Sequence, residues 1–113
     1  MEIEVRFRDL KASEALRHHT VRRLEMALDR FADELTRVVV RLSDVNGPKG
    51  GVDKRCHLTL KGPRVGVLTV HQLSAEVTSA VGMACGIACR MVGREVEMLR
   101  RRHLTRLVRR SGA

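Results

Sequence analysis

The stretch KRCHLTLKGPRVGVLTVH, from Lys54 to His71, decides the fold of this chain. From Cys56 to Leu60 every second residue is apolar, which is typical of a strand with one buried and one exposed face. Gly62-Pro63-Arg64 is turn sequence, and residues 65–71 predict a further strand in which Leu68 and Val70 face inward. Two strands separated by a short turn therefore occupy the middle of the chain.

Two more strands are predicted upstream. Residues 2–8 alternate between apolar and charged side chains, and residues 36–45 are rich in β-branched valine with a similar alternation. The glycine-rich residues 46–51 that follow break regular structure.

Helices are predicted on either side of the last three strands. Ser13 is a suitable N-cap for a helix over residues 13–35, in which apolar residues recur at helical spacing. Ser74 similarly caps a second helix, from about Ala75 to Arg110. Beyond Leu99 the side of this helix that would face a core carries arginine, so its last turns are expected to extend past the sheet.

The order of elements is therefore β-α-β-β-β-α. It predicts an α+β fold in which a four-stranded sheet has two helices packed on one face and solvent on the other. The chain has 113 residues, enough for one modest core. We expect residues 1–108 to form a single α/β domain and residues 109–113 to form a frayed C-terminal tail.

The composition is strongly basic, with a formal net charge of +9 and a pI of about 10.9. All of the basic residues are arginine except Lys11, Lys49, Lys54 and Lys61. Arginine suits phosphate because its planar fork of donors matches the phosphate oxygens, although arginine codons in a GC-rich genome would also raise the arginine content. The near absence of aromatic residues argues against base stacking and favours contacts with a nucleic-acid backbone.

Targeting features are absent from the sequence. No apolar run approaches the roughly 18 residues of a transmembrane span, and the N-terminus lacks a signal pattern. The odd number of cysteines, 3, indicates free thiols. We expect a cytoplasmic protein that does not associate with a membrane.

Basic residues on both helices are candidate phosphate ligands, and they would form one surface if the helices lie side by side. Each neutralised phosphate releases about one counterion, so the affinity should fall steeply with salt. Lys49 and Lys54, beside the glycine-rich loop, could add phosphate contacts. The loop lacks the Gly-Lys-Ser/Thr ending of a nucleotide-binding P-loop. The alternative is a solvated helix end whose cations are favoured by the helix dipole. The candidate RNA-binding residues are Arg17, Arg22, Arg23, Lys49, Lys54, Arg90, Arg94, Arg100 and Arg101.

Gly82, Gly86 and Gly93 project from one side of the second helix. Glycine inside a helix costs about 1 kcal/mol relative to alanine. Close packing by an RNA backbone, by the first helix or by another chain would explain them, and so would simple tolerance of weak positions.

The cysteines and histidines do not form a pattern typical of a metal site or of a catalytic site. Cys85 and Cys89 stand one helical turn apart, but a zinc site needs about four converging ligands, and Cys56 and His57 point to opposite faces of their strand. No carboxylate or serine accompanies the histidines at a recognisable spacing. We expect no metal, no cofactor, no small-molecule substrate and no enzymatic activity.

The order of elements and several local patterns resemble the ribosome hibernation-promoting factors, also called sigma-54 modulation proteins. The resemblance extends from Glu2 to about His103. It is carried by Glu14-Ala15-Leu16-Arg17, by Leu24 to Arg30-Phe31, by Val38-Val39-Val40 and by the helix entry from Glu76 to Val81.

The resemblance implies a fold similar to double-stranded RNA-binding domains. It also implies binding to the small ribosomal subunit and its ribosomal RNA, in the channel for mRNA and tRNA, with inhibition of translation during stress or stationary phase. By position, the residues that resemble the family's RNA-facing ones are Arg17, Arg22, Arg23, Arg90, Arg94 and Arg100.

The length of the chain resembles the family's short form, so any pairing of ribosomes would need another protein. Two alternatives remain open at this point. One is a general double-stranded RNA- or DNA-binding module that acts through backbone contacts, and the other is a protein-interaction module that docks on the glycine side of the second helix.

Overall fold

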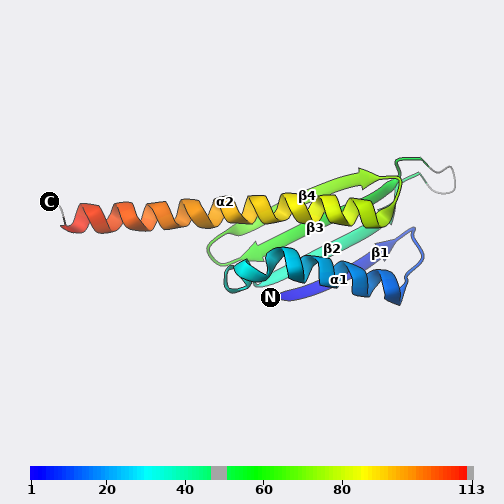
Figure 1. The fold of residues 1–113 in the computed structure, drawn as a ribbon, viewed down its shortest axis with the longest axis horizontal. Helices are drawn as coiled ribbons and strands as arrows, with labels where there is room; N and C mark the ends of the chain where they lie inside the picture. Colours follow the sequence, from blue (N-terminus) through cyan, green and yellow to red (C-terminus); the bar gives the residue numbers. More distant parts are fainter. Residues whose placement is uncertain (47–50, 112–113) are drawn as a thin grey trace.

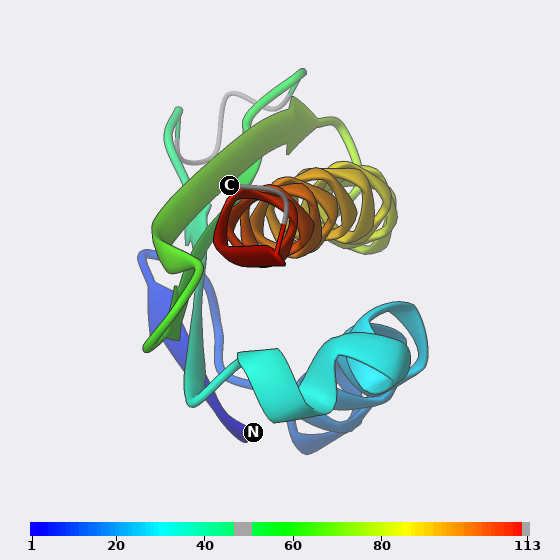
Figure 2. The same ribbon diagram turned by 90° about the vertical axis from the view of Figure 1, so that its left-hand side faces the viewer.

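The computed structural model describes residues 1–46 and 51–111. Within those residues, one four-stranded sheet carries two long helices on the same face (Figures 1 and 2). The α+β fold expected from the sequence is confirmed. The elements are β1 (Glu2–Arg8), α1 (Glu14–Leu28), the 3₁₀ helix η1 (Asp29–Glu34), β2 (Arg37–Asp44), β3 (Lys54–Gly62), β4 (Gly66–Ser74) and α2 (Val77–Ser111).

The strands lie in the order β1-β2-β3-β4. β1 and β2 are parallel, because α1 carries the chain back across the sheet between them, and the other neighbours are antiparallel. The β3–β4 ladder pairs Leu58 with Val70 and ends at Lys54 opposite Ser74. β4 is therefore longer than the predicted strand over residues 65–71, since β3 supplies partners as far as Ser74.

The first helix is shorter than predicted. Ser13 caps it as expected, with its Oγ accepting a hydrogen bond from the Leu16 N–H at 3.2 Å. The α-helix ends at Leu28, however, and residues 29–34 form η1. The tighter 3₁₀ turn brings the backbone to an extended conformation at Leu35, which is 3 % exposed, so that β2 can begin.

The second helix begins later than predicted, at Val77. Ser74 belongs to β4, and its Oγ accepts a hydrogen bond from the Glu76 N–H before the helix starts. At the other end, α2 continues through Arg109 and Arg110 to Ser111, where a frayed tail was expected. Helix formation there needs no core, since arginine is a good helix former and its charge suits the C-terminal end of the dipole.

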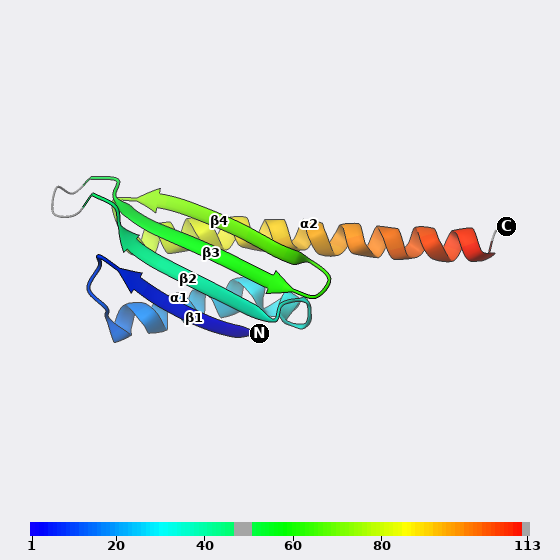
Figure 3. The ribbon, with the colours of Figure 1, turned by 180° about the vertical axis from the view of Figure 1, so that it is seen from behind.

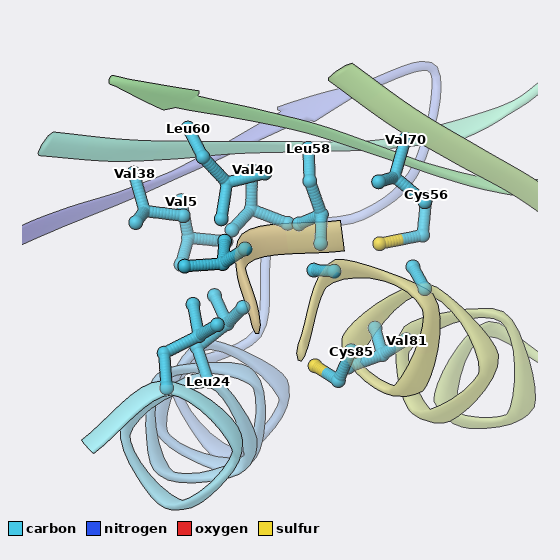
Figure 4. Packing of buried hydrophobic residues seen from close by; sticks show 14 of the residues in the cluster. Val5, Leu24, Val38, Val40, Cys56, Leu58, Leu60, Val70, Val81 and Cys85 are labelled. Atoms are coloured by element: carbon cyan, nitrogen blue, oxygen red, sulfur yellow. The ribbon is translucent and has the colours of Figure 1, made fainter. Parts of the chain in front are cut away.

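The core lies between the sheet and the two helices (Figure 4). Ala80, Ala84 and Ala88 are fully buried at a spacing of four residues, so α2 presents a row of small side chains to the sheet and packs closely on it. The sheet contributes the alternating residues predicted from the sequence, and α1 contributes Leu24 and Leu28. The fully buried residues of the sheet are Val38, Val40, Leu42, Cys56, Leu58 and Leu60.

The last turns of α2 extend beyond the sheet, as expected (Figure 1). Residues 100–111 are all exposed. With 35 residues, α2 is about 52 Å long, and the molecule measures 65 Å along its longest axis. Within the described residues, no helix combines the length and the apolar character needed to cross a membrane.

Candidate nucleic-acid interface

The two helices turn arginine side chains away from the sheet. Burial of Leu24 in α1 directs Arg22 and Arg23 outward, and burial of Ala88 and Val92 in α2 does the same for Arg90 and Arg94. Because α1 and α2 lie side by side (Figure 2), these arginines belong to one face of the molecule, which we call the helix face. It consists of Arg22, Arg23, Arg90, Arg94 and Arg100.

Arg23 lies at the junction of the two helices. A Cβ atom built on Gly82 would stand 3.0 Å from its Nη2, so the guanidinium of Arg23 passes directly over the glycine. A shallow groove of about 310 Å³ follows the junction. It is lined by Arg23, Met26 and Ala27 from α1 and by Gly82, Cys85, Gly86 and Cys89 from α2.

The charges of the helix face are not neutralised within the fold. All five arginines are exposed. Among residues 1–46 and 51–111, none of the five forms an ion pair with a described carboxylate. Their donors are therefore available to an external anion, and their mutual repulsion would be relieved by one.

Arg17 has a different environment from the rest of the predicted set. Its Nη1 donates a hydrogen bond to the Val5 carbonyl at 2.8 Å, and its guanidinium lies 5.1 Å from the centre of the Phe7 ring. Glu14 lies 3.5 Å from its Nε. These contacts fasten α1 to β1, so Arg17 has a structural role in addition to any contact with a ligand.

Lys54, one of the two predicted lysines, does not join the helix face. The Nζ of Lys54 lies 2.8 Å from Asp53 and 3.3 Å from Asp44, and Asp53 is fully buried. The hydrogen bond that Lys54 donates to Asp53, together with the one that it donates to Asp44, raises the pKa of Lys54 above its ordinary value. Lys54 is therefore held in an internal ion-pair network, and its expected phosphate contact stays a prediction. Lys49 lies outside the described residues.

Arg101 lies on the part of α2 that extends past the sheet. Its Nε is 3.5 Å from Glu97, one turn earlier, and its side chain is 76 % exposed. An exposed pair of this kind contributes only about 0.3–0.5 kcal/mol, so a phosphate can displace the carboxylate at little cost. Arg101 thus remains a candidate ligand.

The glycines of α2 have neighbours in the same chain. A Cβ on Gly82 would contact Arg23, and one on Gly93 would lie 3.4 Å from the Phe31 ring. Two of the three glycines therefore face side chains of the first helical segment, at distances that do not by themselves require glycine. At Gly86 the nearest atom is Arg90 Nη1, at 3.8 Å, and the position faces the groove.

The cysteines and histidines are arranged as the alternation of β3 predicts. Cys56 is buried under the helices (Figure 4), whereas His57 lies on the other face of the sheet, where its ring centre is 6.1 Å from that of His71. Burial raises the pKa of Cys56 to about 12 and that of Cys85 to about 11, so both are thiols at neutral pH. Within the described residues, no group of three or more potential metal ligands occurs.

Two basic features of the structure were not predicted from the sequence. Arg30 bridges the helical layer, because its Nη2 lies 3.4 Å from Cys89 Sγ and its guanidinium stacks on Phe31. The uncovered face of the sheet is also basic, with Arg6, Arg41 and Arg55 around a shared hollow. The sequence showed that these three arginines point away from the core. It did not show that they lie close together, because that depends on the order and register of the strands.

The fold is a four-stranded sheet with two helices on one face, and both helices carry exposed arginines. These features define a class of small α+β proteins with a basic helical face. The chain belongs to the family described as sigma 54 modulation protein / S30EA ribosomal protein, whose sequence model matches residues 3–100. The resemblance found in the sequence is confirmed, and membership in this family makes the chain a ribosome-associated protein.

Solved structures agree with this assignment. The N-terminal domain of Protein Y from Thermus thermophilus superimposes with a TM-score of 0.69 at 25% identity, covering 83% of this chain and 98% of that one. A ribosomal subunit interface protein from Coxiella burnetii shares the fold, with a TM-score of 0.68 at 16% identity and coverage of 83% and 96%. No curated protein sequence matches this chain significantly.

Proposed function

We propose that this protein binds the small ribosomal subunit through its helix face and blocks translation by occupying the channel for mRNA and tRNA. Membership in the S30EA family supports the ribosome as the target, and so does the interface protein named among the structural neighbours. The observation that carries the proposal is the row of exposed arginines on α1 and α2 that lack carboxylate partners among the described residues.

The mode of action is occupancy. Two packed helices fix the spacing of the backbone positions that carry these arginines. Several phosphates can therefore be neutralised without ordering a flexible backbone segment. Two described phenylalanines, Phe7 and Phe31, both contact arginines within the fold, which leaves no aromatic platform for base stacking on this face. Recognition therefore depends on the RNA backbone and its shape. We infer a cytoplasmic protein that needs no cofactor and carries out no chemistry.

Density-gradient sedimentation of stationary-phase lysate tests this function. The protein should migrate with the small subunit and with whole ribosomes, and it should be released by raised salt. Its absence from these fractions, in a lysate where the protein is abundant, would refute the proposal.

A general duplex-binding function makes a different prediction. Contacts with phosphate alone carry no sequence information, so the affinity for an arbitrary RNA duplex would then equal the affinity for the small subunit at the same salt concentration. Ribosome-specific binding requires a clear preference for the subunit. Competition between labelled subunits and an unlabelled duplex measures that preference directly.

A further inference from the structure

Figure 3 shows the face of the sheet that the helices leave uncovered. This face carries its own array of basic side chains. Strand register places Arg6, Arg41, His57 and His71 in one row across all four strands. The next row on the same face contains Arg8 and, across β2, Arg55. We call these two rows the sheet face. A hollow of about 510 Å³ lies among them, lined by Arg6, Arg8, Arg41, Arg55 and His57 together with Phe7 and Ser43.

Two cations lie directly opposite each other in this array. Arg6 is paired with Arg41, whose other neighbour in the row is His57. Like charges at opposed positions destabilise a sheet, so nothing in the packing of the strands requires this arrangement. A negatively charged ligand would convert the repulsion into attraction.

Compensation from carboxylates on this face is partial. Arg6 binds Glu4 at 2.8 Å, and Arg8 is 3.9 Å from Asp9 with both side chains largely exposed. Arg41 reaches only Thr59, at 3.5 Å. Among the described residues, neither Arg41 nor Arg55 has an ion-pair partner.

We propose that the sheet face binds the phosphate backbone of a second RNA segment, so that one molecule holds RNA on both of its sides. The inference rests on the proposed function for the nature of the ligand, but it assigns a separate surface. Strands spaced about 4.8 Å apart put the ends of the four-residue row about 14 Å from each other, which exceeds the reach of a single phosphate group and matches an extended polyanion.

His57 gives this surface a dependence on pH. Its pKa is lowered by burial, then by Arg55 on its own strand, by Arg41 on β2 and by His71 on β4. A bound phosphate opposes the repulsion from these neighbours and so favours the protonated imidazole. Binding therefore takes up a proton, and the affinity of the sheet face should rise as the pH falls.

The test measures how many copies of a short RNA stem-loop bind one intact chain, by sedimentation velocity and fluorescence anisotropy at low salt. Wild-type protein should bind two copies. The triple variant Arg8→Gln/Arg41→Gln/Arg55→Gln should bind one, with the tighter binding event unchanged. Its melting temperature should be preserved, since all three side chains lie on the uncovered face and Arg41 stands opposite the like charge of Arg6.

A control variant with the same loss of charge is available on the extended end of α2. Arg106→Gln/Arg109→Gln/Arg110→Gln should still bind two stem-loops, and the second binding event should still tighten at lower pH. His57→Gln should retain two sites but lose that pH dependence.

Three results would overturn the inference: a single site in the wild-type protein, two sites in the sheet-face variant, or inorganic tripolyphosphate displacing RNA from the sheet face at equal phosphate concentration. Each of these leaves ribosome binding through the helix face intact. Loss of all small-subunit binding by the wild-type protein would instead refute the proposed function, so the two failures are distinguishable.

Discussion

At the scale of single residues, Gly62 and Gly82 differ in whether the fold requires glycine at the position. A Cβ on Gly62 would stand 1.9 Å from the backbone oxygen of Glu34, which cannot move without disrupting η1. A Cβ on Gly82 would meet only the flexible end of Arg23, at 3.0 Å. The same substitution should therefore have opposite effects at the two sites.

Gly62→Ala should destabilise the protein by about 2–3 kcal/mol through overpacking. Gly82→Ala should stabilise it by about 0.5–1 kcal/mol, because alanine favours the helix and the exposed guanidinium can shift. Urea unfolding of both variants measures the difference. Equal destabilisation by the two substitutions would contradict the packing described at Gly82.

Glu4 links a single residue to the acid stability of the protein. Hydrogen bonds from Arg6, and then from Arg37, lower its pKa from 4.5 to about 2. A carboxylate with a lowered folded pKa contributes stability that is present above the unfolded value and is lost as the pH falls through the folded value. The contribution of Glu4 should thus disappear between about pH 4.5 and about pH 2.

The variant Glu4→Gln isolates this contribution. The difference in unfolding midpoint between wild type and variant should be constant above pH 4.5 and should vanish near pH 2. A difference that persists undiminished at the acid end would show that Glu4 acts through packing instead of through its charge.

At the scale of elements, α2 divides into a packed part and an extended part. Ala80 to Val92 holds the helix on the sheet, whereas residues 100–111 are exposed throughout. The packed part contributes stability and the extended part contributes charge. Removal of the extended part should therefore have little effect on the stability of the protein.

Truncation after His103 tests this division. The free energy of unfolding should change by no more than about 0.5 kcal/mol, as for surface changes in general. Loss of Arg106, Arg109 and Arg110, which lie outside the helix face, should leave the affinity for the small subunit close to that of the wild-type protein. A large loss of stability, or a large loss of affinity, would contradict the division.

Elements were also the scale at which the sequence was most informative. Alternation along residues 54–60 predicted which side chains of β3 are buried. The arginines beyond Leu99 predicted that the last turns of α2 extend past the sheet. The end of α1 was not predictable from spacing alone, since the apolar pattern continues to Leu35 while the backbone changes to a 3₁₀ turn after Leu28. That change is imposed by the start of β2.

The candidate site was predictable only in part. The sequence shows which residues are charged, but it does not show which of them form ion pairs within the fold. Arg22 and Arg94 are exposed as expected, but Lys54 is held by Asp53, which is its neighbour in sequence and yet fully buried. The basic sheet face could not be assembled from the sequence, since the pairing of Arg6 with Arg41 depends on parallel pairing of β1 with β2.

At the scale of the whole molecule, two basic surfaces lie on opposite sides of one thin core. The shorter axes of the molecule measure 23 and 17 Å, so a ligand on the helix face and a ligand on the sheet face would lie close together without touching. This layout suits a protein that sits between RNA segments and explains why both surfaces can share one small fold.

Removal of charge from the α2 part of the helix face should weaken binding without unfolding the protein. The variant Arg90→Gln/Arg94→Gln/Arg100→Gln changes only exposed side chains, so its melting temperature should match that of the wild type. Its affinity for the small subunit should fall at least about tenfold, because up to three phosphate contacts are lost. A filter-binding assay measures this affinity. Arg106→Gln/Arg109→Gln/Arg110→Gln serves as the charge-matched comparison and should bind more tightly than the helix-face variant.

A chemical footprint of small-subunit RNA, with wild-type protein and with the helix-face variant, tests channel occupancy most directly. Bound wild-type protein should protect nucleotides that line the mRNA and tRNA channel, and the variant should leave them reactive at the same concentration. Protection scattered over exposed helices elsewhere on the subunit, or equal protection by the variant, would show that the protein does not act by occupying the channel through its helix face.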